Sequence, residues 1–264
     1  SMKPWILTIV GLALIGLLWS PAGAVPAAPG EAPRLVLLVA VDQMRYDYLP
    51  RFADAFTGGL RQLTRAGAVF TNAHLDHYPS VTAVGHAAML TGARPGISGI
   101  VGNDWYDRGL KKNVTSVEDP GTTLLGVAEA GMGCSPHRLR VSTIGDELKM
   151  AHPGSRVIGL SHKDRSAILM AGRMADLALW WDTKTGAFVS STWYAPELPR
   201  WAADFNAGKP ADAWLGREWR ALGEGGAVLG RMPETPGPAY IETPSGSSGE
   251  TLVEILDAAS EGRP

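Results

Sequence analysis

The pattern of hydrophobic and polar positions divides the chain into segments that alternate between strand-like and helix-like. Residues 34–41 (RLVLLVAV) form a continuous aliphatic run that ends at Asp42. Continuous rather than alternating hydrophobicity predicts a strand buried on both faces, as in a parallel sheet. The following pattern predicts a helix within residues 52–66, stopped by Gly67, and then a strand over residues 68–75.

The same alternation continues through the rest of the chain. Small residues at 82–90 predict a helix closed by Gly92, and residues 142–151 predict a helix with Thr143 as N-cap and Glu147 nearby. Residues 156–160 predict a buried strand, which the segment 161–170 follows, and residues 177–181 with 188–193 predict a hairpin around Thr185 and Gly186. Residues 196–222 predict Trp-containing helical pieces, residues 233–249 a loop, and residues 251–259 a last helix. Strands alternating with helices predict an α/β fold with a mostly parallel sheet flanked by helices. Ligands bind such sheets beyond the carboxyl ends of strands, where Asp42 is expected.

The N-terminal residues follow a different pattern. Lys3 precedes an apolar run over residues 5–19, and Ala22-Gly23-Ala24 follows with small-x-small spacing. This order predicts a secretory signal peptide over residues 1–24, and therefore a secreted or periplasmic protein. The run is shorter than the roughly 20 residues of a transmembrane helix, so we expect no membrane span after cleavage. Residues 25–33, rich in Pro and Ala, predict a flexible leader.

Composition and charge narrow the functional class. Of the 264 residues, 45% are hydrophobic, which is enough to fill a core, and the formal net charge is −2. The absence of a basic surplus argues against nucleic acid as a partner. Cys134 is the only cysteine in the sequence, so no internal disulfide can form. None of these features indicates an oligomeric state.

The densest candidate chemistry lies in residues 78–107. Thr82 would open the small-residue helix, where free N–H groups and the positive end of the helix dipole favour an alkoxide and a bound phosphate. A nearby divalent metal would favour ionisation of the hydroxyl further. Local spacing alone nevertheless favours the simpler role of an N-cap for Thr82.

Three features together resemble the Thr-nucleophile branch of the alkaline phosphatase superfamily, which is related to the type I phosphodiesterase/nucleotide pyrophosphatases. They are Asp42 after an aliphatic strand, Thr82 in T-x-x-G-H-A, and residues 102–106 (GNDWY). The resemblance runs from Arg34 onward but corresponds only to the N-terminal half of such a domain. It implies an alkaline phosphatase-like α/β fold over residues 34–264, incomplete at the C-terminus. Within it we predict residues 177–250 as a cap or insert region, whose Trp-rich part, residues 180–219, either covers the active site or packs against the rest of such a domain.

The resemblance also implies a role for individual residues. Asp42 corresponds to the N-terminal zinc ligand, Thr82 to a nucleophile that also contacts zinc, and Asn103 to an amide donor to a phosphate oxygen. Lys163 and Arg165 correspond to a Lys-x-Arg pair that binds the phosphate of monoesters, whose dianion carries more charge than a diester. Without the resemblance, the local sequence indicates only an Asp at a strand end for Asp42, a helix cap for Thr82 and a turn Asn for Asn103. Lys163 and Arg165 would then belong to a solvated polar stretch.

Residues 134–138 (CSPHR) contain a competing motif, the C-x-P-x-R core of sulfatases, which belong to the same superfamily. In that motif Leu-Thr-Gly follows the cysteine at offsets of eight to ten. After Cys134 these positions hold Ser-Thr-Ile, whereas after Thr82 they hold Leu90-Thr91-Gly92. The spacing of the sulfatase motif therefore places Thr82, rather than Cys134, at the position of the sulfatase cysteine. We interpret Cys134 as a loop residue.

The function implied by the resemblance is zinc-dependent hydrolysis of small phosphate monoesters through a phosphothreonine intermediate, with two zinc ions per complete site. This chain offers two ligands, Asp42 and Thr82, whereas zinc wants about four, and we assign none of the six histidines to metal. We therefore expect weak zinc binding and impaired catalysis from this chain alone. The alternatives are a phosphodiesterase or nucleotide pyrophosphatase on the same scaffold, and a noncatalytic fragment that binds phosphorylated ligands.

Overall fold

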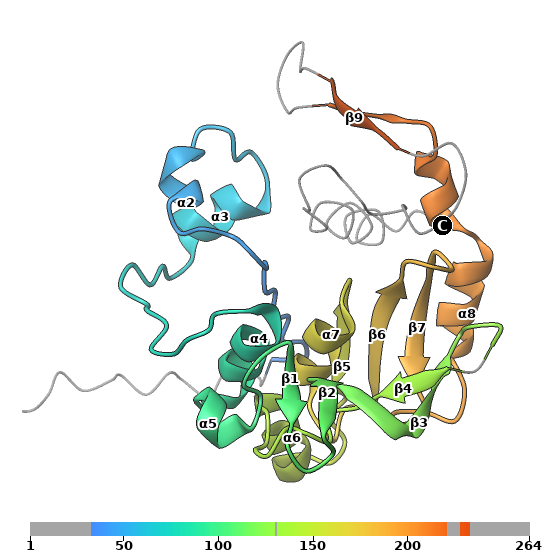
Figure 1. Ribbon diagram of the computed structural model, residues 1–264. Coiled ribbons are helices and arrows are strands. Elements are labelled where there is room, and N and C mark those ends of the chain that lie inside the picture. Colours follow the sequence, from blue (N-terminus) through green and yellow to red (C-terminus); the bar gives the residue numbers. More distant parts are fainter. Residues whose placement is uncertain (1–32, 130, 221–227, 233–264) are drawn as a thin grey trace, which may run out of the picture. The chain divides into compact units, whose positions relative to one another are not determined.

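The structure, a computed structural model, describes residues 33–129, 131–220 and 228–232 (Figure 1). The chain divides into two units, Ser1–Val39 and Ala40–Pro264. The described part of the first unit, residues 33–39, contains no helix or strand and is exposed. The predicted signal peptide, most of the leader, the loop 233–249 and the helix 251–259 lie outside the described residues.

The described part of the second unit contains a central sheet, helices and two small sheets. The helices are α2 (Tyr48–Arg51), α3 (Gly59–Ala66), α4 (Thr82–Thr91), α5 (Pro95–Ser98), α6 (Ile144–Ala151), α7 (Asp164–Ala171) and α8 (Arg200–Ala207), with the 3-10 helix η1 (Pro210–Trp214). The strands are β1 (Asp104–Asp107), β2 (Lys112–Thr115), β3 (Glu118–Leu125), β4 (Met132–Cys134), β5 (Ile158–Ser161), β6 (Leu177–Asp182), β7 (Ala187–Ser191), β8 (Glu218–Arg220) and β9 (Val228–Arg231). No described helix has the length and apolar character needed to cross a bilayer.

The predicted α/β class is confirmed, but the described sheet is mixed rather than mostly parallel. Its strand order is β4-β3-β7-β6-β5, and only β5 and β6 pair in parallel. Parallel pairing needs a crossover, which α7 supplies between β5 and β6. Short connections instead turn β6 back into β7, at the predicted hairpin, and β3 back into β4, so these pairs are antiparallel.

Two predicted strands do not form. Residues 34–41 and 68–75 are irregular, and Leu35 and Phe70 are 80% and 83% exposed. A run buried on both faces needs neighbouring strands, and no described strand pairs with either segment. Of the helix expected within residues 52–66, only α3 forms, ending at Gly67 as predicted.

Several local predictions are confirmed. Thr143 is the N-cap of α6, and the side chain of Asp146, rather than Glu147, completes the capping box. Gly92 ends α4 in the left-handed conformation, with φ of 64°. The Trp-containing region forms α8 and η1, whereas Trp219 falls in β8.

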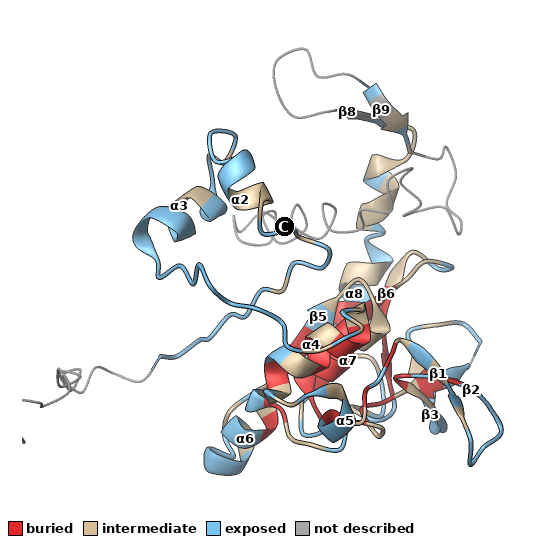
Figure 2. Cartoon of the chain, turned by 60° about the vertical axis from the view of Figure 1, so that its left-hand side comes forward, coloured by how far each residue is buried: buried red, intermediate tan, exposed pale blue. Residues whose placement is uncertain are grey.

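Helices cover both faces of β6. Ala178 and Trp180 belong to the buried cluster formed with α4 and α7, while their neighbours Leu177, Leu179 and Trp181 belong to a second cluster that includes Ala202 of α8. Figure 2 shows the buried residues concentrated in α4, α7 and the adjoining strands, whereas α2 and α3 have none. The core therefore lies around α4, α7 and the sheet.

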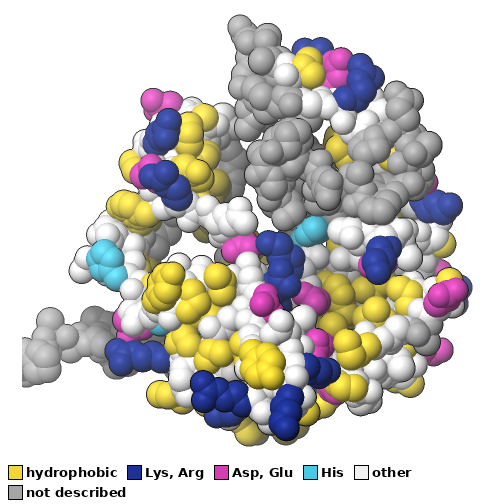
Figure 3. All heavy atoms as spheres, viewed as in Figure 1, with side chains coloured by type: hydrophobic (Ala, Val, Ile, Leu, Met, Phe, Trp, Pro, Cys, Tyr) yellow, Lys and Arg dark blue, Asp and Glu magenta, His cyan; other side chains and the backbone are white. Residues whose placement is uncertain are grey.

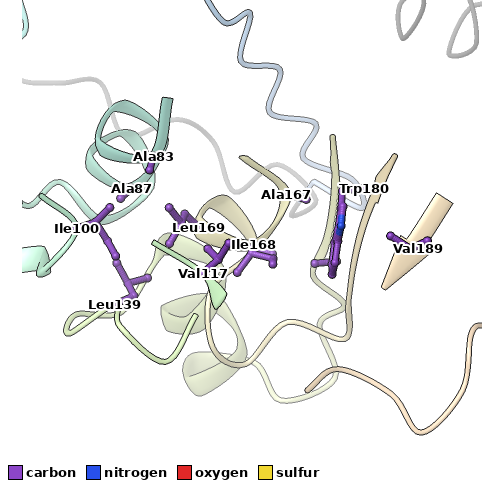
Figure 4. Packing of buried hydrophobic residues seen from close by; sticks show 12 residues of the cluster. Ala83, Ala87, Ile100, Val117, Leu139, Ala167, Ile168, Leu169, Trp180 and Val189 are labelled. Carbon is purple, nitrogen blue, oxygen red and sulfur yellow. The ribbon is translucent and has the colours of Figure 1, made fainter. Parts of the chain in front are cut away.

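Small side chains on α4 allow α7 to pack against it. Ala83 and Ala87 of α4 are completely buried, and Leu169 of α7 belongs to the same cluster, whereas Ala167 and Ala171 of α7 lie against Gly159 of β5 (Figure 4). Methyl-sized side chains allow two helices to approach closely. This packing places the beginning of α4 near the beginning of α7.

Glycine 159 sets the corresponding spacing between β5 and α7, so we expect Gly159→Ala to destabilise the protein. A Cβ at Gly159 would overlap the carbonyl oxygen of Ala167 and lie 2.8 Å from the Cβ of Ala171. Overpacking of this kind costs about 1–3 kcal/mol, which a lower urea midpoint would report. Gly154→Ala is the matched control, because nothing lies within 4 Å of its added Cβ. Equal midpoints for the two variants would contradict this packing.

Candidate active site

Asp42 lies where two helices begin. Thr82 is the first residue of α4, and Lys163 is the N-cap of α7. The Thr82 hydroxyl donates a hydrogen bond to Asp42 Oδ2 at 3.0 Å, and the Lys163 ammonium donates to the same oxygen at 3.2 Å. One carboxylate oxygen therefore links segments that are 40 and 121 residues away from it along the chain.

The hydroxyl of Thr82 does not cap its helix. Val81 occupies the N-cap position with extended backbone and makes no side-chain capping bond. Thr82 stands one position later and donates its hydroxyl proton to a carboxylate instead of accepting a backbone N–H. The N-cap role favoured by local spacing is therefore wrong.

Asn103 caps α4 from a distance. Its side-chain Oδ1 accepts the N–H of Ala83 at 2.9 Å, and its backbone carbonyl accepts the N–H of Ser116 at 2.8 Å. Since Oδ1 is used in this way, the amide NH2 group remains as the donor that Asn103 can offer a ligand.

The first turn of α4 retains free donors. The N–H groups of a helix's first turn have no acceptor within the helix, and they carry the positive end of its dipole. Among the described residues, Ala83 N–H is bonded to Asn103, but no group accepts from the N–H of Thr82 or Val84. This helix end can therefore bind an anion.

The charges around Asp42 favour its ionised form. Partial burial by itself raises the pKa of Asp42, but hydrogen bonds from Thr82 and Lys163, together with the positive charge of Lys163, hold that pKa below its usual value. Figure 3 shows Lys and Arg side chains next to Asp and Glu side chains near the centre of the face viewed. Asp42 is therefore a carboxylate at neutral pH, and it accepts from both partners.

Arg165 lies beside this set rather than in it. Its backbone N–H donates to Asp164 Oδ1 at 2.6 Å, and its Nη1 lies 3.5 Å from the same oxygen. Its Nε is buried and has no hydrogen-bond partner among the described residues. The structure thus joins Asp42, Thr82, Lys163 and Asn103 through hydrogen bonds, directly or through the Ala83 amide, whereas no bond connects Arg165 to them.

Cys134 is the last residue of β4 and pairs with Glu118 of β3, so its interpretation as a loop residue is wrong. Its thiol lies 3.9 Å from Asp164 Oδ2. Burial, with the charges of Asp164 and Asp119, raises the pKa of this thiol to about 12. A thiol that stays protonated is a poor nucleophile, so the Cys134 thiol is not suited to attack a substrate itself.

Two partners of the site residues were not given a role from the sequence. His86, one turn after Thr82, is buried, and its Nδ1 lies 2.8 Å from the Thr82 carbonyl oxygen. The four-residue spacing could have indicated this contact. Asp164 contacts Arg165 and Cys134, and only its position between Lys163 and Arg165 could have drawn attention to it.

The donor set suits part of a metal site. Asp42 Oδ2 and Thr82 Oγ1 are oxygen donors 3.0 Å apart, close enough to share one ion. No group of three or more His, Cys, Asp or Glu side chains comes together in the part of the chain that the structure describes. These residues therefore fit zinc as two ligands, fewer than the four that it usually takes.

Comparisons with known proteins agree with this picture. The family model described as Type I phosphodiesterase / nucleotide pyrophosphatase matches residues 36–226. Alkaline phosphatase PafA of Elizabethkingia meningoseptica is 39% identical over 223 residues, covering 83% of this chain and 40% of PafA. Alkaline phosphatase PhoV of Synechococcus elongatus is 41% identical over 192 residues, covering 72% of this chain and 35% of PhoV.

Solved structures show the same relationship. The crystal structure of wild-type PafA matches with a TM-score of 0.71 at 34% identity, over 84% of this chain and 48% of that one. A PafA variant with one Thr, one Asn, one Lys and one Arg substituted matches with a TM-score of 0.67 at 38% identity, over 69% of this chain and 36% of that one. The chain thus spans less than half the length of these relatives.

Proposed function

The chain belongs to the type I phosphodiesterase / nucleotide pyrophosphatase family of the alkaline phosphatase superfamily, and from this premise we propose that it is the nucleophile-bearing part of a secreted or periplasmic, zinc-dependent phosphomonoesterase. One observation carries the proposal. The Thr82 hydroxyl, at the N-terminus of α4, shares a carboxylate oxygen of Asp42 with the Lys163 ammonium. The likeness to PafA and PhoV supports hydrolysis of a phosphoester.

In the proposed reaction, the Thr82 oxygen attacks the phosphorus of a phosphate monoester. The alcohol leaves, Thr82 carries the phosphoryl group, and water then hydrolyses this phosphothreonine. Before attack, the hydroxyl proton is directed at Asp42 Oδ2. The oxygen is thereby fixed at the beginning of α4, where helix N–H groups favour the negative charge that it develops.

The phosphate oxygens have several donors within reach of this helix end. The NH2 group of Asn103 and the free N–H groups of Thr82 and Val84 suit the equatorial oxygens of a phosphoryl group. The PafA variant carries substitutions of the same four residue types, with the same Thr–Asn and Lys–Arg separations as Thr82–Asn103 and Lys163–Arg165. This correspondence supports a joint role for the four residues.

The choice of monoesters rests on Lys163 and Arg165. A monoester brings one more negative charge than a diester, and two cations at the beginning of α7 would neutralise it. The family name favours the alternative, a phosphodiesterase or nucleotide pyrophosphatase on the same scaffold. The small number of metal ligands in the described residues favours a third possibility, a noncatalytic fragment that binds phosphorylated ligands.

Zinc would be held by Asp42 and Thr82, and when bound it would favour the ionised form of the Thr82 hydroxyl. The other ligands would come from the part of the family domain that this chain does not span. Of the residues 177–250 expected to form a cap or insert, 177–191 contribute β6 and β7 to the central sheet, so the proposed cap is confined to residues after them. Lys163 already bonds to the same carboxylate oxygen. Two ligands and a competing ammonium predict weak binding of zinc.

We therefore expect this chain to bind zinc at least about 100-fold more weakly than a form that carries the rest of the family domain. Calorimetric zinc titration of both forms measures the difference, and Asp42→Asn should remove the binding that remains in this chain. Turnover of p-nitrophenyl phosphate and of bis-p-nitrophenyl phosphate by both forms tests the proposed reaction. Tight zinc binding and full monoester turnover by this chain alone would contradict the division of ligands.

A further inference from the structure

Asp164 contacts a functional residue without belonging to the proposed reaction. We propose that Asp164 is a positioning residue, which holds the guanidinium of Arg165 in the orientation that receives a phosphate oxygen. The inference rests on the proposed function for its ligand, but its geometric part concerns Arg165 alone. Asp164 is the first residue of α7 and stands between Lys163 and Arg165.

One oxygen of Asp164 contacts both ends of Arg165. Asp164 Oδ1 accepts the backbone N–H of Arg165 at 2.6 Å and lies 3.5 Å from Nη1 of the same residue. The long arginine side chain has many rotamers when it is free. An acceptor fixed at the helix start, with an oxygen facing Nη1, reduces these to conformations that fold the guanidinium back over the beginning of α7.

The other oxygen of Asp164 contacts the sheet. Cys134 Sγ, at the end of β4, lies 3.9 Å from Asp164 Oδ2. Burial and the nearby carboxylates raise the pKa of this thiol to about 12, so it remains protonated and acts as the donor. Both carboxylate oxygens are therefore engaged, one by the sheet and one by Arg165, and this limits rotation of the Asp164 carboxylate.

The contact with Asp164 orients the guanidinium of Arg165 but leaves it donors for another group. At 3.5 Å the Asp164–Arg165 pair is longer than the pairs Arg94–Asp76 and Lys149–Asp176, both of which measure 2.6 Å. The Nε of Arg165 is buried and has no described partner. A buried donor without a partner is costly unless a ligand satisfies it. Arg165 thus keeps donors for an anion while Asp164 sets their direction.

The test uses this chain and the Nε–H signal of Arg165 in a nitrogen-15 NMR spectrum, identified by its disappearance in Arg165→Lys. Asp164→Asn is the informative variant, because its Oδ1 still accepts the backbone N–H of Arg165 while the charge and the acceptor for Cys134 are lost. We expect the Arg165 Nε–H of this variant to exchange with water at least about tenfold faster, because a neutral amide holds the guanidinium less strongly than a carboxylate and the side chain leaves its folded-back conformation more often. Asp182→Asn, at the last residue of β6, is the control and should leave the signal unchanged, because the Asp182 side chain bonds to Thr185 of the same hairpin. An unchanged signal in Asp164→Asn would overturn the inference.

Titration with inorganic phosphate separates the inference from the proposed function. In the unsubstituted chain phosphate should shift the Arg165 signal, and in Asp164→Asn the apparent Kd should rise about tenfold, as expected for one charged hydrogen bond. If Asp164→Asn loosens Arg165 but phosphate shifts the signal in neither protein, the positioning holds and the proposed phosphate site fails. If phosphate binds both proteins equally or binds the variant more tightly, Asp164 does not orient Arg165 for phosphate and the inference fails.

Discussion

Thr82→Ala is expected to lower kcat/KM for p-nitrophenyl phosphate by at least about 1,000-fold, because it removes the oxygen that accepts the phosphoryl group. The hydrogen bond to Asp42 Oδ2, 3.0 Å away, and the backbone at the start of α4 hold the Thr82 hydroxyl in one position. Steady-state kinetics in the longest form of the protein that hydrolyses the monoester would measure the loss.

Thr82→Ser is the control for this experiment, because it keeps the attacking oxygen, and it should retain activity within about tenfold. Neither variant removes a helix cap, since Val81 is the N-cap and Asn103 binds the Ala83 amide. Thermal unfolding should therefore be nearly unchanged in both. A Thr82→Ala protein that keeps most of its activity would exclude Thr82 as the nucleophile.

The second large effect concerns the choice between substrates. Replacing Lys163 and Arg165 together by Ala should lower kcat/KM for the monoester by about 100- to 1,000-fold and for bis-p-nitrophenyl phosphate by less than about tenfold. Charge-assisted hydrogen bonds to phosphate are worth roughly 1.5–3 kcal/mol each, and a diester offers less charge to receive them. The ratio of the two kcat/KM values is the measurement.

Arg200→Ala is the control for the loss of a cation, because Arg200 is on α8 and its side chain is 94% exposed. It should leave both substrates unaffected, since an exposed ion pair contributes little. Equal losses on monoester and diester in the Lys163/Arg165 variant would favour the phosphodiesterase alternative.

Sequence signals predicted the elements that depend on neighbouring residues. α6 begins directly after its N-cap Thr143 because the capping box closes within four residues, and α4 ends before its C-cap Gly92 because a left-handed residue is needed there. The aliphatic run at 34–41 has no such local determinant. A strand exists only when another strand pairs with it, and hydrophobicity alone does not specify that partner.

The site was accessible from the sequence only through resemblance. Asp42, Thr82 and Lys163 meet at one oxygen, although 121 residues separate the first from the last. No periodicity or spacing predicts such a meeting, because it follows from the packing of α4 against α7. The contact of Asp164 with Cys134 also joins distant segments, 30 residues apart, and the CSPHR motif around that cysteine indicated a different chemistry.

The alanines on the buried face of α4 have a consequence for how this site can vary. Ala83 and Ala87 contact no substrate in the proposed reaction, yet their single methyl groups allow α7 to lie close to α4. A larger residue at either position would push the beginning of α4, and with it Thr82, away from Lys163 while leaving every reacting group in place. Natural selection for hydrolysis should therefore act on these two buried positions as well as on the reacting groups.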